Sequence, residues 1–266
     1  MLTKSHGLGN DYLVADPAEL PFVVSPERVR LVCDRHIGVG SDGLLLQDGT
    51  MGLRILNPDG SEAEKSGNGL RIFARWLFDT RRVEVRTFTI EVGGAQADVE
   101  VHADGSVTAD MGRPTFRDEV RTLTLGDGEA YTVVALAIGN PHCVLFRSKL
   151  DITELHRLGP LVERHPAFPR RTNVQLAHVV DPGTVELLIW ERGAGETRAS
   201  GSSACAVVAA AHRAGLVAAE VSARMPGGEL SVRVGSDGRL WQRGPVEELA
   251  RITLSPELIR RLQALP

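Results

Sequence analysis

The sequence has few cysteines and no long hydrophobic run. Its 266 residues include only three cysteines, Cys33, Cys143 and Cys205, and no two of them form a CxxC pair. An odd count argues against a disulfide framework, and no Cys or His spacing is typical of a metal site. No apolar run approaches the roughly 18 residues of a membrane span, and the chain start has no signal-peptide h-region. We therefore expect a cytoplasmic protein without metal or membrane association.

Basic clusters are also missing. The 30 Lys and Arg residues are scattered among 34 Asp and Glu, which gives a net charge of −4. The Arg-Arg pairs at 81–82, 170–171 and 260–261 are interpreted as solvated surface, so no nucleic-acid partner is expected. A hydrophobic content of 42% is ordinary for a soluble globular protein. The length allows two domains of about 130 residues each.

A glycine-rich motif occurs twice. In each copy an apolar run (53–56; 185–190) leads into a polar Gly-rich loop, a Ser-Gly pair and an apolar helical pattern. The two serines, Ser66 and Ser200, are 134 positions apart. After each serine, apolar residues recur with the i, i+3, i+4, i+7 spacing of one helix face: Leu70, Phe73, Ala74, Leu77, and Ala204, Val207, Val208, Ala211. The pattern predicts two helices that begin at equivalent serines.

Other landmarks recur at nearly the same separation. Gly9-Asn10 corresponds to Gly139-Asn140, and the hairpin signal at 104–105 corresponds to that at 237–238. These matches predict an internal duplication, with halves 1–112 and 113–254 and a tail, 255–266, that packs back on the first half. We expect an α+β fold of two pseudo-symmetric domains, each a curved, mostly antiparallel sheet wrapped around a central helix.

Two interpretations of Ser66 and Ser200 are open. A serine before an apolar helical run is commonly just an N-cap. If the halves face each other across a pseudo-twofold axis, however, both helix N-termini point into a common cleft, where unpaired N–H groups suit an anion such as a carboxylate. The paired spacing favours this functional interpretation.

Several local patterns have simple structural interpretations. The GxGxxG at 38–43 lacks a preceding strand and a following helix, so it is interpreted as a bend into a strand rather than a dinucleotide site. Alternation predicts strands at 83–90 and 97–102, and the apolar run 131–138 predicts another. Cys205 is typical of a small core residue. His142, beside a turn, is more typical of a hydrogen-bonded core histidine than of a catalyst.

The motifs taken together resemble the diaminopimelate epimerase family over essentially the whole chain. They are His6-Gly-Leu-Gly-Asn10-Asp, Cys33-Asp-Arg-His36, Asn57-x-Asp-Gly-Ser-Glu-x-Glu64, Ser66-Gly-Asn-Gly, Gly139-Asn-Pro-His142 and Glu191-Arg-Gly-x-Gly-Glu-Thr197. The resemblance implies a cofactor-independent isomerase and homodimer that interconverts LL- and meso-diaminopimelate for lysine and peptidoglycan synthesis. A base removes the Cα proton from one face, and an acid returns a proton to the other.

The resemblance also implies roles for individual residues. Residues matching the acid and base positions, or thought to tune them, are Ser66, Ser200, His142 and Glu191. Residues matching substrate contacts are Asn10, Asn57, Asn140, Asn173, Glu191 and Arg192. The backbone amides expected to hold the α-carboxylate belong to Gly67, Asn68, Gly201 and Ser202.

The chain departs from the family at the reacting groups. The family has a cysteine at each helix start, where this chain has Ser66 and Ser200, and many relatives have a substrate-contacting glutamine where this chain has Gly43. A thiol titrates near pH 8.5, and a helix N-terminus lowers that value, whereas a serine hydroxyl normally needs a neighbouring base. Two alternatives therefore stand beside the epimerase: a related cofactor-independent racemase or isomerase for another amino acid, and an amino-acid-binding homologue without catalysis.

Overall fold

The computed structural model describes residues 1–63, 66–126 and 128–266 of the chain. The chain divides into two compact units, which are described separately. Unit 1 comprises Met1–Ala109 and Pro245–Pro266, and unit 2 comprises Asp110–Gly244. No helix in the described part of the chain is long and apolar enough to span a membrane.

Unit 1 is a mixed sheet with a buried helix. Its strands are β1 (Leu2–Gly7), β2 (Asn10–Ala15), β3 (Leu44–Asp48), β4 (Gly52–Leu56), β5 (Glu62–Ala63), β6 (Thr87–Val92), β7 (Ala95–Val101), the first part of β8 (Val107–Gly112), and β20 (Glu247–Ile252). Its helices are the short 3₁₀ helix η1 (Pro17–Glu19), α1 (Pro26–Cys33), α2 (Gly67–Asp79) and α5 (Pro256–Gln263).

Unit 2 repeats this plan. Its strands, after the end of β8, are β9 (Thr115–Phe116), β10 (Thr122–Thr124), β11 (Ala130–Thr132), β12 (Val134–Ile138), β13 (Asn140–Phe146), β14 (Asn173–Asp181), β15 (Thr184–Glu191), β16 (Gly195–Thr197), β17 (Glu220–Met225), β18 (Gly228–Val234) and β19 (Leu240–Gly244). Its helices are α3 (Ile152–Glu163) and α4 (Gly201–Arg213).

The strand pairings of the two units follow the same sequence. In unit 1 the strand order is β20-β1-β2-β3-β4-β6-β7-β8. The pairs β2–β3 and β4–β6 are parallel, and the other neighbouring pairs in this order are antiparallel. In unit 2 the strand order is β9-β12-β13-β14-β15-β17-β18-β19, and its parallel pairs, β13–β14 and β15–β17, stand at the same places in the order. Short β5 on β4 matches short β16 on β15. The duplication predicted from the sequence is therefore present in the topology.

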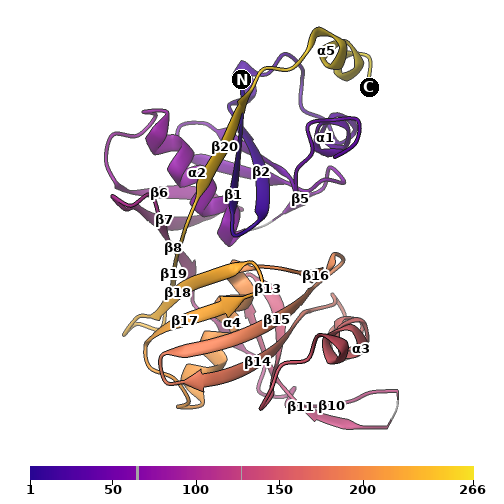
Figure 1. Ribbon diagram of the computed structural model, residues 1–266, viewed down its shortest axis with the longest axis vertical. Helices are drawn as coiled ribbons and strands as arrows, with labels where there is room; N and C mark the ends of the chain where they lie inside the picture. Colours follow the sequence, from indigo (N-terminus) through magenta and orange to yellow (C-terminus); the bar gives the residue numbers. More distant parts are fainter. Residues whose placement is uncertain (64–65, 127) are drawn as a thin grey trace. The chain divides into compact units, whose positions relative to one another are not determined.

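The central helix of each unit is buried against its sheet (Figure 1). In α2, Leu70, Phe73 and Leu77 are fully buried in a core with β-strand residues of unit 1. In α4, residues 203–208 are fully buried as well, Cys205 among them. Both helices are apolar on more than one face because strands surround them, as the sequence pattern predicted.

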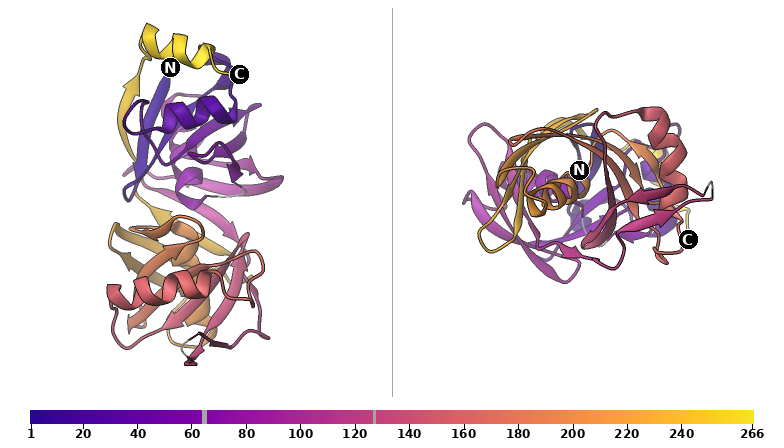
Figure 2. Two further views of the ribbon diagram at one scale, coloured as in Figure 1. Left: turned by 90° about the vertical axis from the view of Figure 1, so that its right-hand side faces the viewer. Right: turned by 90° about the horizontal axis from the view of Figure 1, so that it is seen from below.

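The C-terminal segment belongs to unit 1. Strand β20 pairs with β1, and α5 follows it. Arg28 of α1 donates hydrogen bonds to the carbonyl oxygens of Leu262 (2.8 Å) and Leu265 (2.5 Å), and Figure 2 shows α5 beside α1. The structure thus differs from the sequence-based boundary at 254, because the β1 edge accepts residues 247–252 as a further strand.

Two other local expectations differ from the structure. The alternating run expected from residue 83 becomes a strand only at Thr87, because residues 83–86 do not enter the ladder between β6 and β7. The expected strand at 131–138 is divided into β11, which pairs with β10, and β12, which pairs with β13. The bend at 38–43 does follow a helix, α1, and precede a strand, β3, as predicted.

Candidate functional site

Helix α2 begins at a serine that caps it. Ser66 has an extended backbone (φ −134°, ψ 124°), and its Oγ accepts a hydrogen bond from the Gly69 N–H at 3.0 Å. The same Oγ lies 3.3 Å from the Tyr12 hydroxyl. The next backbone N–H groups, of Gly67 and Asn68, belong to the first helical turn, whose donors have no intrahelical acceptor. The N-cap interpretation therefore holds for Ser66, and among the described residues none accepts a hydrogen bond from the Gly67 or Asn68 N–H.

Helix α4 begins at a serine that does not cap it. Ser200 has nearly the same backbone (φ −147°, ψ 122°), yet its side chain makes no capping hydrogen bond to the described first turn of the helix. Its Oγ lies 3.5 Å from the Ser202 Oγ, and its N–H donates to the Met225 sulfur at 3.5 Å. The two predicted serines are thus equivalent in backbone position but differ in side-chain environment.

Asn10 and Asn68 are joined by side-chain hydrogen bonds in unit 1. Asn68 Nδ2 donates to Asn10 Oδ1 at 3.0 Å, and Asn10 Nδ2 donates to Asp42 Oδ2 at 2.9 Å. Arg71, fully buried in α2, donates to Asn68 Oδ1 at 2.6 Å. The bonds fix the orientation of both amides at the start of α2.

An ionic cluster supports the start of β2, which carries Asn10. Asp11 lies 3.0 Å from Lys4 Nζ and 2.6 Å from Arg35, which also reaches Asp42 at 2.7 Å. Burial alone would raise the pKa of Asp11, but hydrogen bonds from Arg35 and Lys4 hold it below its ordinary value. Asp11 therefore stays ionised at neutral pH and anchors the β1–β2 turn.

Asn57 follows the end of β4. Its Nδ2 donates to Ser61 Oγ at 3.0 Å, and its backbone N–H donates to the Ser61 carbonyl at 2.8 Å. These bonds shape the turn that leads toward α2. Glu64, the last residue of the same motif, lies outside the described residues.

His142 holds Asn140 in unit 2. It is fully buried, and its Nε2 lies 2.9 Å from Asn140 Oδ1. Gln175 Nε2 lies 3.1 Å from His142 Nδ1 and 3.0 Å from Ser203 Oγ. Since an amide nitrogen only donates, Nδ1 is the acceptor and Nε2–H donates to Asn140. Burial lowers the pKa of His142 to about 3, so the ring is neutral at pH 7.

This neutral histidine makes stability depend on pH. In the unfolded chain His142 binds a proton below about pH 6.5, whereas in the folded chain it does so only below about pH 3. Between these two values the unfolded state binds more protons, so the free energy of unfolding falls as the pH falls. We expect a contribution of up to about 1.4 kcal/mol per pH unit. Urea unfolding from pH 7 to 4 should show a shallower pH dependence of the free energy of unfolding for His142→Gln than for the unaltered protein. Equal slopes of the free energy of unfolding against pH for the unaltered protein and His142→Gln would contradict this prediction.

Asn173 connects two segments near the second motif. Its Nδ2 donates to the Pro141 carbonyl at 3.0 Å, and its Oδ1 accepts the Arg192 N–H at 2.9 Å. The adjoining turn is held by buried Glu163, whose carboxylate accepts the Trp190 Nε1–H at 2.9 Å and the Gly193 N–H at 3.0 Å. The backbone of 190–193 is therefore fixed on both sides.

Glu191 and Arg192 differ in exposure. Glu191 is half-buried at the end of β15, where it pairs with Gly195, and Arg192 is exposed. The Arg192 guanidinium donates to the Arg170 carbonyl at 3.3 Å. Burial is the larger cause of the lowered pKa of His142, and the positive charge of Arg192 lowers it further.

Gly201 is closely packed at the first position of α4. A methyl group added there would lie 2.3 Å from Gln242 Oε1, and Gln242 itself is fully buried. Gly43 is similarly confined, since a methyl group there would lie 2.8 Å from the Tyr12 ring and 2.6 Å from the Leu56 carbonyl oxygen. Both glycines permit close approach of a neighbouring side chain.

The structure joins some of the predicted residues by hydrogen bonds within each unit. In unit 1 Asn10 is bonded to Asn68 in the first turn of α2, and in unit 2 His142 is linked to Asn140 while Asn173 is linked to Arg192. Sequence reasoning missed Tyr12, Asp42, Glu163 and Gln175. Only Tyr12 had a signal, as the neighbour of the Gly9-Asn10-Asp11 motif.

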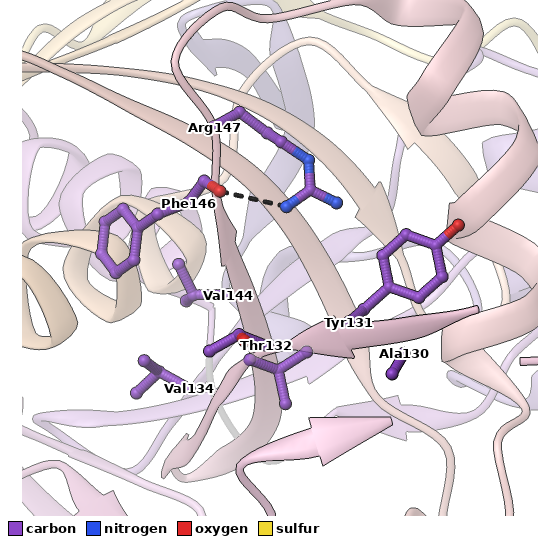
Figure 3. A pocket seen from close by; sticks show the side chains of 8 residues that line it. Ala130, Tyr131, Thr132, Val134, Val144, Phe146 and Arg147 are labelled. Atoms are coloured by element: carbon purple, nitrogen blue, oxygen red, sulfur yellow. Dashed lines mark hydrogen bonds between the residues drawn. The ribbon is translucent and has the colours of Figure 1, made fainter. Parts of the chain in front are cut away.

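A pocket in unit 2 contains none of these residues (Figure 3). It has a volume of about 380 Å³ and is lined by residues of β11, β12 and β13 with Arg147. Arg147 is already bound to the Phe146 carbonyl at 3.0 Å and to Glu154 at 2.9 Å. Its charge is therefore neutralised within the fold, and none of the predicted site residues is among the lining residues.

Comparison with known proteins identifies the family. A family model described as diaminopimelate epimerase matches residues 2–117 and 134–249, one segment for each half of the repeat. The chain belongs to the diaminopimelate epimerase family. It is 41% identical to diaminopimelate epimerase 2 of Nostoc sp., with 96% of this chain and 95% of the relative aligned. It is 39% identical to diaminopimelate epimerase of Desulfitobacterium hafniense, with 92% and 94% aligned.

Solved structures share the fold at low identity. A hydroxyproline epimerase from Agrobacterium vitis superposes with a TM-score of 0.71 at 14% identity, covering 94% of this chain and 90% of the other. A phenazine biosynthesis protein from Bacillus anthracis gives 0.69 at 14% identity, covering 94% and 97%. The predicted α+β fold of two similar domains is therefore confirmed.

Proposed function

We propose that this protein interconverts LL- and meso-2,6-diaminopimelate without a cofactor, in lysine biosynthesis. The observation that carries the proposal is the equivalence of the two helix starts within the repeat. Each start combines a Ser-Gly pair with the first-turn amides of a buried helix in a chain of this family, and at α2 Asn68 is bonded to Asn10. Such starts suit a molecule that must be held by a carboxylate while a proton moves.

The first-turn amides are proposed to bind the α-carboxylate. In α2, the Gly69 N–H is already bonded to Ser66 Oγ, and Gly67 and Asn68 are the two residues before it. Gly201 and Ser202 hold the corresponding positions in α4. Unpaired N–H groups and the helix dipole both stabilise a negative charge there. The same groups stabilise the additional charge that spreads from Cα into the carboxylate when the proton leaves.

The asparagines are proposed to orient the rest of the substrate. Asn10 and Asn140 are held by fixed partners, Asp42 and Asn68 for the first and His142 for the second. Asn57 and Asn173, with Glu191 and Arg192, are proposed to complete the contacts. We assign His142 the role of holding Asn140, because a neutral, buried ring is poorly suited to titrate during turnover.

Ser66 and Ser200 are proposed as the groups that exchange protons with Cα. The serine that acts as the base enters the step with its hydroxyl deprotonated and takes the Cα–H proton, while the bonding electron pair moves into the carboxylate. The other serine delivers its O–H proton to the opposite face as that pair returns to Cα, so the negative charge ends on the second serine. General acid–base catalysis of this kind contributes about 10²–10⁴-fold. The serines make the reaction slower than thiols would, because a hydroxyl holds its proton more tightly.

Isotope exchange tests the proposal. Incubation with meso-diaminopimelate in D₂O should give Cα deuteration and a changing LL:meso ratio by NMR, and Ser66→Ala or Ser200→Ala should abolish epimerisation. Turnover of proline, glutamate or histidine without turnover of diaminopimelate would select a related racemase instead. Tight binding of diaminopimelate without exchange would select a binding protein.

A cytoplasmic homodimer is part of the same proposal. It is supported by the family alone, since the structure describes one chain. Sedimentation at micromolar concentration should give twice the 28.7 kDa chain mass. A monomer that is fully active would contradict it.

A further inference from the structure

We propose that the Tyr12 hydroxyl is the proton partner of Ser66, so that the two residues act together as one acid–base pair. The inference rests on the proposed function and assigns a role to a side chain outside the serine and asparagine set. Tyr12 acts through Ser66, and it is therefore a positioning residue rather than a group that touches Cα.

The contact between the two hydroxyls is built by the sheet. Tyr12 lies in β2 with only 7% of its surface exposed, and its Oη is 3.3 Å from Ser66 Oγ. Because Gly69 N–H already donates to that oxygen at 3.0 Å, Ser66 Oγ lies between a backbone donor and a phenol. Either hydroxyl can donate to the other, which is the arrangement that a proton relay requires.

Gly43 makes room for this arrangement. Strands β2 and β3 pair in parallel with Leu13 beside Leu44, which brings Gly43 next to Tyr12. A methyl group at position 43 would lie 2.8 Å from Tyr12 Cε1 and 3.2 Å from Cδ1, so a larger side chain would displace the ring. The two departures from the family pattern, Gly43 and Ser66, are thus connected physically through one tyrosine.

The proton transfers balance in both directions. In protonation, the Ser66 O–H proton forms the new bond to the Cα carbanion while the Tyr12 O–H proton passes to Ser66 Oγ. Ser66 ends as a neutral hydroxyl, and the negative charge ends on the Tyr12 phenolate. In deprotonation, the Cα proton passes to Ser66 Oγ as the Ser66 proton passes to the phenolate.

A phenol improves on serine alone. A free phenol has a pKa of about 10, whereas the pKa of an aliphatic hydroxyl is far higher. Moving the charge to the phenol therefore avoids a serine alkoxide. Ser200 differs, because its hydroxyl neighbour at 3.5 Å is Ser202, another aliphatic alcohol.

Tyr12→Phe tests the relay because it retains the ring against Gly43 and removes only the hydroxyl. We expect kcat for epimerisation to fall about 10²-fold with KM little changed, and the basic limb of the kcat–pH profile to shift. In a protein that already carries Ser66→Cys, the thiol can ionise without a proton partner. Tyr12→Phe should then lower kcat by less than about threefold. Tyr131→Phe, at the chain's other tyrosine, is the matched control and should leave kcat unchanged.

The outcomes separate this inference from the proposed function. Exchange by the unaltered protein that Tyr12→Phe leaves intact would overturn the relay alone. An equal loss with and without the Ser66→Cys substitution would also overturn it, because packing rather than proton transfer would then explain the effect. Absence of exchange in the unaltered protein, with turnover in the double-cysteine form, would reject serine chemistry and the relay together.

Discussion

Replacement of both Ser66 and Ser200 by cysteine is expected to raise kcat for diaminopimelate epimerisation by about 10²–10⁴-fold. Both positions have the extended backbone of a residue before a helix N-terminus. A helix N-terminus lowers the pKa of a thiol from about 8.5 into the working range, whereas a hydroxyl at the same place stays protonated. The measurement is the initial rate of Cα deuteration and of LL:meso interconversion for the unaltered and double-cysteine proteins.

Single replacements separate the two serines. Because two different groups must remove and return the proton, Ser66→Cys and Ser200→Cys should each give less than the double replacement. Ser255→Cys is the matched control, since Ser255 also caps a helix, with its Oγ 3.2 Å from the Leu258 N–H. A double-cysteine protein no faster than the unaltered one would show that these positions do not exchange protons with Cα.

Gly201→Ala is expected to lower kcat/KM by about 10²-fold while the protein remains folded. The added methyl would meet Gln242 Oε1 at 2.3 Å, and Gln242 is fully buried with its Nε2 3.0 Å from the Met111 sulfur. The buried Gln242 side chain or the start of α4 must therefore shift, and we expect the tight packing around Gln242 to displace the proposed carboxylate-binding amides of α4. Overpacking of this kind also costs about 1–3 kcal/mol of stability. Steady-state kinetics and urea unfolding measure the two effects.

A compensating substitution distinguishes displacement from general damage. Gly201→Ala combined with Gln242→Ala removes the amide that the methyl meets, so the double variant should recover much of the lost kcat/KM. Gln242→Ala alone serves as the control for the missing side chain. Activity of Gly201→Ala equal to that of the unaltered protein would mean that the amide positions at α4 do not limit catalysis.

The architecture could be predicted largely from the sequence. The spacing of Ser66 and Ser200 and the apolar periodicity after each predicted the two central helices, because a helix buried on several faces has a distinctive pattern. The hairpin signals at 104–105 and 237–238 predicted β7–β8 and β18–β19. Strand limits were less accurate at residues 83–86, where an alternating pattern does not enter the β6–β7 ladder.

The side-chain environment of the two helix starts could not be predicted in this way. The same Ser-Gly pattern gives a capped helix at Ser66, whereas Ser200 makes no such bond to its own described helix. Tyr12 and Ser66 are 54 positions apart, and nothing in local spacing indicates that their hydroxyls meet. Gln175 is 33 positions from His142, yet it settles which nitrogen of that ring accepts a hydrogen bond.

By itself, the sequence determined the duplicated α+β plan, the family and the equivalence of Ser66 and Ser200. These follow from periodicity and motif spacing, which are properties of neighbouring residues along the chain. Only the tertiary structure decided that β20 joins the first unit, that His142 is neutral and that Tyr12 contacts Ser66. The reason is physical: burial, register and hydrogen-bond partners arise from contacts between distant segments, and they exist only once the sheets have formed.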